Sequence, residues 1–176
     1  MSKYISLTAI GKDKPGIVAA VTKVLYELNC NIEDSTMTIL HGQFAMILII
    51  NPPKDISCKM LQSKLAKSAK ALKLSIAYSE LPSTPVKKQK KQNEYIVSVY
   101  GADKPGIVYG VSGFLAQKKI NIVDVQTMVS NKNYIMIIEA VFPSSLLAAK
   151  LKKEIAELAK MLGVTISVNQ AESSDI

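Results

Sequence analysis

The residues of this chain best suited to chemistry belong to one short motif that occurs twice. Gly-x-Asp-Lys-Pro-Gly-Ile-Val occupies residues 11–18 and, at an offset of 90 residues, residues 101–108. A second motif, Asn-Ile-x-Asp, follows each copy at residues 31–34 and 121–124. Twelve residues from these motifs are the candidate ligand-binding residues: Gly11, Asp13, Pro15, Gly16, Asn31, Asp34, Gly101, Asp103, Pro105, Gly106, Asn121 and Asp124.

The glycine-rich motif predicts a turn that leads from a strand into a helix. A helix N-terminus offers unpaired N–H groups and a partial positive charge, which suit a carboxylate. Gly16 is expected to let a ligand approach the backbone closely, and Pro15 to preset the first helical turn. We expect the aspartate and asparagine oxygens of both motifs near the same end of the sheet, where they would accept hydrogen bonds from an ammonium group. These features predict a site for a small amino acid.

The same residues also have a purely structural interpretation. Asp13 and Asp103 would then cap the helices by accepting hydrogen bonds from N–H groups. Asn31 and Asn121 would only shape the turn from helix to strand. Repetition does not separate the two interpretations, since a structural turn is duplicated as faithfully as a binding turn. Both stay open at the level of the sequence.

Other kinds of chemistry have little support in this sequence. The Gly-x-x-x-x-Gly spacing is followed by Ile-Val rather than the Lys-Ser/Thr of a phosphate-binding loop. Ser112 does not lie in a Gly-x-Ser-x-Gly elbow, because Phe114 takes the last position. His41 is the only histidine, and Cys30 and Cys58 do not form a Cys-x-x-Cys pair. We therefore expect no catalytic residue, no metal and no cofactor.

The elements that must position the motifs follow in the same order in both halves. Alternating and helix-spaced apolar residues predict this order as strand, helix, strand, strand, helix, strand. Ile5, Leu7 and Ala9 are expected on the apolar face of the first strand, and Val18 and Met60 on the apolar stripes of the two helices of the first half. The predicted strands are 3–10, 32–40, 43–50, 74–81, 94–100, 120–129, 134–142 and 164–169, and the predicted helices are 17–28, 56–72, 107–118 and 144–162. The expected fold class is α+β, with two ferredoxin-like βαββαβ modules in tandem.

Composition sets the predicted domain boundaries. Residues 1–81 and 94–170 are the two modules, residues 82–93 are a linker rich in proline and lysine, and residues 171–176 are a flexible tail. The third strand of each module is apolar on both faces, which is typical of a strand buried on both sides. We therefore expect the sheets to be packed or extended against each other, or against another chain, for which a homodimer is a candidate.

Charge and hydropathy bear on partners and compartment. A net charge of +8 invites a nucleic-acid hypothesis, but the chain has no arginine, and many of its lysines fall in the linker and on one helix. Direct nucleic-acid binding is therefore only a minor alternative. No apolar run approaches the roughly 20 residues of a membrane span, and no signal peptide is recognisable. Two unpatterned cysteines suggest a reducing compartment, so we expect a cytoplasmic protein.

The two motifs and the order of elements resemble those of the ACT domain family. Asp-Lys-Pro-Gly-Ile-Val at the first turn and Asn-Ile-x-Asp at the second strand carry the resemblance, which covers both halves. ACT domains are small amino-acid-sensing regulatory modules, and their ligands lie between modules, against this turn and the start of the second strand. Formyltetrahydrofolate hydrolases and some phosphoserine phosphatases open with similar turns, but this chain leaves no residues for their catalytic domain.

The tandem arrangement is most similar to that of the glycine cleavage system transcriptional repressors. This resemblance implies a non-enzymatic regulator that binds a small amino acid, with glycine as the first candidate. It also implies a protein partner, such as a DNA-binding transcription activator. Two alternatives remain: a regulatory subunit of an amino-acid metabolic enzyme, as acetolactate synthase has, and a direct nucleic-acid-binding protein.

Overall fold

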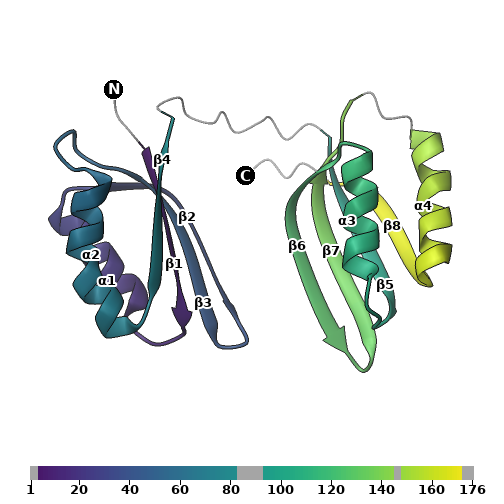
Figure 1. The fold of residues 1–176 in the computed structure, drawn as a ribbon. Helices are drawn as coiled ribbons and strands as arrows, with labels where there is room; N and C mark the ends of the chain where they lie inside the picture. Colours follow the sequence, from purple (N-terminus) through teal and green to yellow (C-terminus); the bar gives the residue numbers. More distant parts are fainter. Residues whose placement is uncertain (1–3, 83–92, 145–147, 172–176) are drawn as a thin grey trace. The chain divides into compact units, whose positions relative to one another are not determined.

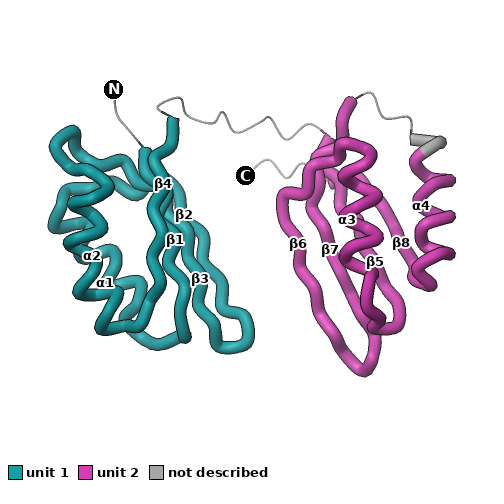
Figure 2. The backbone as a smooth tube through the Cα atoms, in the orientation of Figure 1, with its two compact units in different colours: residues 1–87 teal, residues 88–176 magenta. Residues whose placement is uncertain are grey.

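The chain forms two compact units, residues 1–87 and residues 88–176 (Figure 2). The computed structural model describes residues 4–82, 93–144 and 148–171, and the side chains of residues 148–150 are not described. Most of the predicted linker and tail, and the beginning of the predicted helix at 144–162, lie outside the described residues. In each unit two helices cover one face of an antiparallel sheet, which confirms the α+β fold (Figure 1).

Unit 1 has the predicted βαββαβ order. Its strands pair as β2-β3-β1-β4, and every neighbouring pair is antiparallel. The elements are β1 (Tyr4–Lys12), α1 (Ile17–Glu27), β2 (Asn31–Leu40), β3 (Gln43–Asn51), α2 (Cys58–Leu72) and β4 (Ser75–Leu81).

Unit 2 repeats this arrangement with the strand order β6-β7-β5-β8. Both sheets therefore have the first strand of the unit in an inner position and the second strand at an edge. The elements are β5 (Glu94–Ala102), α3 (Ile107–Gln117), β6 (Asn121–Ser130), β7 (Asn133–Val141), α4 (Ala148–Leu162) and β8 (Val164–Gln170).

Alternation along the inner strands accounts for the core of each unit. Ile5, Leu7 and Ala9 of β1 are buried, as predicted, because successive side chains of a strand point to opposite faces. Apolar residues of the helices close the core from one side. In unit 1 these buried helix residues are Ile17, Val21, Leu25, Leu61 and Leu65.

Two predicted core positions are wrong. Val18 and Met60 are exposed, although both were expected on the apolar stripe of a helix. Each lies one position away from a buried neighbour, Ile17 and Leu61, and two consecutive helical residues point about 100° apart. The helix therefore buries only one residue of each apolar pair.

Apolar side chains are also exposed on the sheet face that the helices leave open. Ile10 and Ile47 of unit 1 and Tyr100 and Ile137 of unit 2 are the main examples. The edge strand β2 has all ten residues exposed. The described residues of each unit leave these side chains exposed, so burial of this face by another module or chain stays a prediction.

Candidate functional site

The repeated glycine-rich motif forms a turn of four residues between the first strand and the first helix of each unit. In unit 1 it runs from Asp13 to Gly16, and Gly16 is the N-cap of α1 with φ of 92°. The equivalent Gly106 has φ of 97°. A positive φ of this size favours glycine, because a Cβ atom would be strained there. Pro15 and Pro105, which were expected to preset the first helical turn, each directly precede the N-cap glycine.

The helix N-termini at these turns carry no side-chain cap. The described residues make no side-chain hydrogen bond at either N-cap, and both Asp13 and Asp103 are exposed. The capping interpretation of these aspartates is therefore wrong. The first intrahelical bonds are from the amide of Ala20 to the carbonyl of Gly16 (2.9 Å) and from Gly110 to Gly106 (2.8 Å). The amides of the first three helical residues thus have no acceptor within the helix.

A hairpin fixes the backbone of each turn. The amide of Asp13 donates to the carbonyl oxygen of Gly42 (2.8 Å), and the amide of Asp103 donates to that of Lys132 (3.2 Å). The contribution of these hairpins was not predicted. Antiparallel pairing of the first and third strands was the available signal, because it brings the hairpin before the third strand next to the end of the first.

Gly11 and Gly101 have a packing role. A Cβ atom on Gly11 would lie 2.8 Å from Cδ2 of Leu74 and 3.0 Å from the carbonyl oxygen of Lys73. A Cβ atom on Gly101 would lie 2.8 Å from Cγ1 of Val164. These glycines therefore let the first strand of each unit pack closely against the residues at the start of its last strand.

A hollow of about 640 Å³ opens at the turn of unit 2. It brings together three of the predicted site residues of this unit, Asp103, Pro105 and Gly106, with the beginning of α3. Its lining residues are Asp103, Lys104, Pro105, Gly106, Ile107, Val108, Tyr109 and Tyr134. Both features expected of an amino-acid site are present: the helix N-terminus for a carboxylate and Asp103 for an ammonium group.

Tyr134 also lines this hollow, although the sequence did not predict it as a site residue. The residue is 8% exposed, and its hydroxyl donates to the sulfur of Met136 over 3.7 Å. Burial raises the pKa of Tyr134, and the Asp103 carboxylate raises it further. The available signal was the replacement of Phe44 in the first copy by a tyrosine in the second, which adds a polar atom to an apolar position.

The structure does not bring Asn31 and Asp34 to the turn. The expectation that both motifs lie near the same end of the sheet is therefore wrong within a unit. Asn31 pairs with Asn51 at the end of the sheet where β1 begins, whereas the turn follows the end of β1. The physical reason is that α1 runs back along the sheet before β2 starts. Nine residues at about 3.3 Å each separate the two ends by roughly 25–30 Å. Asn121 and Asp124 lie at the corresponding far end of unit 2.

The strand-start residues are exposed in both units but make different contacts. A β-bulge lies between Ile32 and Asp34. In unit 1, Asn31 and Asn51 both donate to Oε1 of Glu33, at 3.1 and 3.3 Å, and Asp34 accepts from the amide of Ser35 at 2.8 Å.

Unit 2 lacks the carboxylate at the centre of this network, because Val123 stands in place of Glu33. Asp124 instead accepts a hydrogen bond from the side-chain amide of Gln126 (3.2 Å). Asp124 also lies opposite Glu139 in the β6–β7 pair. The two strand starts are thus chemically unequal.

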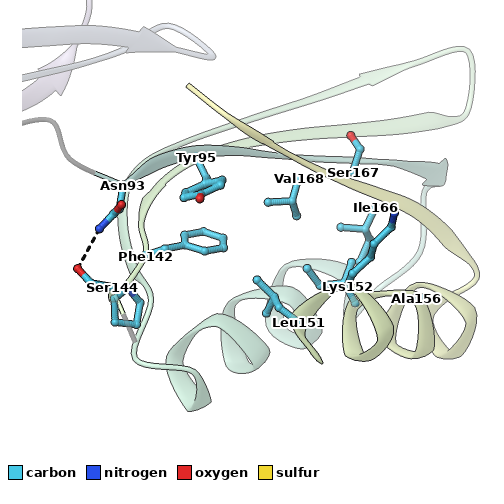
Figure 3. Close-up of a pocket in the computed structure, with 12 residues that line it drawn as sticks. Asn93, Tyr95, Phe142, Ser144, Leu151, Lys152, Ala156, Ile166, Ser167 and Val168 are labelled. Atoms are coloured by element: carbon cyan, nitrogen blue, oxygen red, sulfur yellow. Dashed lines mark hydrogen bonds between the residues drawn. The ribbon is translucent and has the colours of Figure 1, made fainter. Parts of the chain in front are cut away.

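A second cavity, of about 520 Å³, lies at the far end of unit 2 from the turn (Figure 3). Tyr95 and Phe142 stack there with ring centroids 4.3 Å apart, and the side-chain amide of Asn93 donates to the hydroxyl of Ser144 at 3.0 Å. The rest of its wall is largely apolar. None of the predicted site residues lines this cavity, so it is separate from the candidate site.

The described segments also bear on catalysis and membranes. They contain no cluster of three or more histidine, cysteine or acidic residues arranged to hold a metal. His41 is exposed at the tip of a hairpin, and burial raises the pKa of the Cys30 thiol. Among the helices of residues 4–82, 93–144 and 148–171, none has the length and apolar character needed to cross a membrane.

Comparison with known proteins connects both units to one family. The ACT domain family model matches residues 3–79 and 94–169. A UPF0237 protein of Methanopyrus kandleri is 39% identical over 71 residues, which cover 40% of this chain and 79% of that protein. The glycine cleavage system transcriptional repressor of Escherichia coli is 26% identical over 121 residues, which cover 69% of this chain and 62% of the repressor.

Solved structures show that the fold of the whole chain has precedents. An unknown protein from Galdieria sulphuraria matches with a TM-score of 0.79 and 25% identity, over 97% of this chain and 99% of that one. The crystal structure of a putative glycine cleavage system transcriptional repressor matches with a TM-score of 0.69 and 21% identity, over 97% and 98% of the two chains. With one family match on each unit, this chain belongs to the ACT domain family and carries two ACT domains in tandem.

Proposed function

We propose that this protein is a non-enzymatic regulator that binds a small amino acid at the turn of an ACT domain. The observation that carries the proposal is the hollow at the start of α3, where uncapped helix amides and the Asp103 carboxylate line one space. Glycine is the first candidate ligand, because the chain is similar to the glycine cleavage system transcriptional repressor.

The chemistry of the turn suits the two charged groups of an amino acid. The amides at the N-terminus of α3 would donate to the ligand carboxylate, helped by the positive end of the helix dipole. The Asp103 carboxylate would accept a hydrogen bond from the ammonium group. In unit 1 the amides at the start of α1 and the Asp13 carboxylate would have the same roles.

We further propose that a second module completes the site. Asn121 and Asp124 lie too far from the turn of their own unit to contact the same ligand. An antiparallel arrangement of two edge strands would bring the strand start of one module next to the turn of another. The strands β2 and β6 suit such pairing, because they are long, exposed edge strands with apolar side chains. A homodimer would provide this second module.

The regulatory mechanism would be linkage between ligand binding and module packing. An amino acid shifts the equilibrium between two arrangements only by the difference in its affinity for them. A protein partner would then distinguish the two arrangements. We propose a DNA-binding transcription activator as this partner. We expect this protein and the partner to act in the cytoplasm.

Calorimetric titration of the full chain with glycine and the other amino acids tests the proposal. We expect saturable binding, and a loss of affinity of about tenfold or more at the altered site in Asp13→Asn and Asp103→Asn, because asparagine lacks the negative charge that strengthens the hydrogen bond from the ammonium group. Asp55→Asn is the matched control, since Asp55 is exposed and follows the far end of β3. Absence of binding for every amino acid would overturn the proposal.

Affinity capture from cell extract, with and without the bound amino acid, tests the partner. Recovery of a DNA-binding transcription regulator would support the proposed role. Recovery of an amino-acid metabolic enzyme would instead identify a regulatory subunit. Direct binding to nucleic acid through the exposed lysines of α2 would appear as an affinity that falls steeply with salt.

A further inference from the structure

The two turns differ in one buried side chain beside the repeated motif. Phe44 pairs with Gly11 in unit 1, and Tyr134 pairs with Gly101 in unit 2. Phe44 and Tyr134 are both buried, with relative exposures of 1% and 8%. The only chemical difference between the two side chains is the hydroxyl of Tyr134. This hydroxyl belongs to a residue that lines the hollow at the start of α3.

The Tyr134 hydroxyl has only a weak partner among the described residues. It donates to the Met136 sulfur at 3.7 Å, and a thioether is a poor acceptor. A buried donor that exchanges water for such an acceptor loses free energy. Burial and the Asp103 carboxylate both raise the pKa of Tyr134, so the hydroxyl keeps its proton at neutral pH and remains a donor.

We propose that Tyr134 is a ligand-contacting residue that makes the turn of unit 2 a tighter amino-acid site than the turn of unit 1. The Tyr134 hydroxyl donates a hydrogen bond to one carboxylate oxygen of the bound amino acid, while amides of α3 bind the other oxygen. Phe44 cannot make this bond, so the carboxylate of an amino acid at the turn of unit 1 has one hydrogen bond fewer. This inference rests on the proposed function, because it assumes that an amino acid binds at the turns.

The proposal predicts two sites of unequal affinity that a single oxygen atom distinguishes. A hydrogen bond to a charged acceptor such as a carboxylate changes affinity by about tenfold or more. Tyr134→Phe should weaken the tighter site by this factor and leave the weaker site unchanged. Phe44→Tyr should strengthen the weaker site. Tyr95→Phe is the control, because Tyr95 stacks on Phe142 at the far end of unit 2 and should leave both sites unchanged.

The experiment is calorimetric titration of the full chain with each of the twenty amino acids, and of these variants with those that bind. Nuclear magnetic resonance of protein labelled with carbon-13 at the tyrosine Cζ atoms provides a direct second measurement. The Tyr134 signal, assigned by its loss in Tyr134→Phe, should shift on addition of the amino acid that binds. Thermal unfolding of each variant checks that the fold is retained, which Phe44 in the other unit leads us to expect.

The outcomes distinguish failure of the proposed amino-acid binding from failure of the proposed role of Tyr134. If the unaltered chain binds none of the twenty amino acids, the proposed function fails and this inference fails with it. If the unaltered chain binds but Tyr134→Phe has the same affinities and the Tyr134 signal does not move, only this inference is overturned. An equal weakening of both sites by Tyr134→Phe would also overturn it.

Discussion

The amide of Asp13 donates a 2.8 Å hydrogen bond to the carbonyl oxygen of Gly42, and so connects the turn after β1 to the hairpin between β2 and β3. Unit 2 has the same connection between Asp103 and Lys132, at 3.2 Å. The aspartate expected to bind an ammonium group therefore projects from a backbone that a second loop holds in place. The hairpin thus helps to hold the candidate site in place, although no hairpin residue was predicted to belong to the site.

Gly106 and Gly113 should respond to alanine in opposite directions. Gly106 has φ of 97°, so Gly106→Ala should lower the free energy of unfolding by about 1–2 kcal/mol. Gly113 lies within α3, and a Cβ atom there would have nothing within 4 Å. Gly113→Ala should therefore raise the free energy of unfolding by about 0.5–1 kcal/mol. Urea denaturation of the two variants provides the measurement, and equal stabilities would contradict the prediction.

Gly101→Ala should destabilise unit 2 through overpacking. The added Cβ would lie 2.8 Å from Cγ1 of Val164 and 3.2 Å from its Cα. Relief of such a contact requires a shift of β8, and we expect a loss of about 1–3 kcal/mol in urea denaturation. In the double variant Gly101→Ala/Val164→Ala the Cγ1 contact is absent, so the double variant should lose less stability than the sum of the two single variants. Strict additivity would show that the contact does not cause the loss.

Tyr78 should make unit 1 less stable at alkaline pH. Burial, and secondarily the negative charge of Cys58, raises the pKa of Tyr78 from 10.0 to about 12. Below pH 10 both the folded and the unfolded chain keep the proton, and the stabilisation is fully present. Between about pH 10 and 12 the unfolded chain loses the proton first, so the free energy of unfolding falls as pH rises.

Urea denaturation at several pH values between about 9 and 12 measures this fall. Tyr78→Phe should have a smaller fall, since phenylalanine has no proton to lose. Tyr26→Phe should behave like the unaltered chain, because Tyr26 is 80% exposed. An unchanged pH dependence in Tyr78→Phe would be evidence against a raised pKa for Tyr78.

The ion pair between Lys118 and Glu154 should contribute more stability than the pair between Lys23 and Glu27. The Lys118–Glu154 distance is 2.5 Å, the side chains are 25% and 26% exposed, and the Lys118 ammonium also lies 5.5 Å from the centroid of the Phe114 ring. The Lys23–Glu27 distance is 3.9 Å, and these side chains are 73% and 58% exposed. Water and salt screen exposed charges more strongly.

A double-mutant cycle on each pair, with lysine changed to methionine and glutamate to glutamine, gives the coupling free energy. We expect about 1 kcal/mol for Lys118–Glu154 and at most about 0.5 kcal/mol for Lys23–Glu27. Similar couplings for the two pairs would show that the difference in burial has no effect on their strength.

The periodic spacing of apolar residues along the sequence predicted most of the fold. The alternation that predicted one buried face for Ile5, Leu7 and Ala9 is confirmed, because the direction of a side chain along a strand depends only on its position in that strand. The predicted order of helices and strands in both units is also confirmed, because the spacing of apolar residues within a short segment distinguishes a helix from a strand. Val18 and Met60 were misplaced because the exact face that a helix buries depends on the sheet against which it packs.

The candidate site could be predicted only in part. Asp13 and Gly16 lie in the predicted strand-to-helix turn, since that turn is a local feature of the motif. The expected proximity of Asn31 was wrong, because the return path of α1 along the sheet sets where β2 begins. Tyr134 was missed because a contact across antiparallel strands joins residues that are distant in the sequence.

The sequence by itself determined that this protein is a pair of βαββαβ modules with a repeated strand-to-helix turn, because repeats, alternation and turn chemistry are properties of short segments. Only the tertiary structure decided which polar groups share a space. It set Tyr134 beside the start of α3 and separated Asn121 from the same turn by the length of the sheet. Strand pairing and helix direction decide such distances, and they are set by the packing of the whole unit.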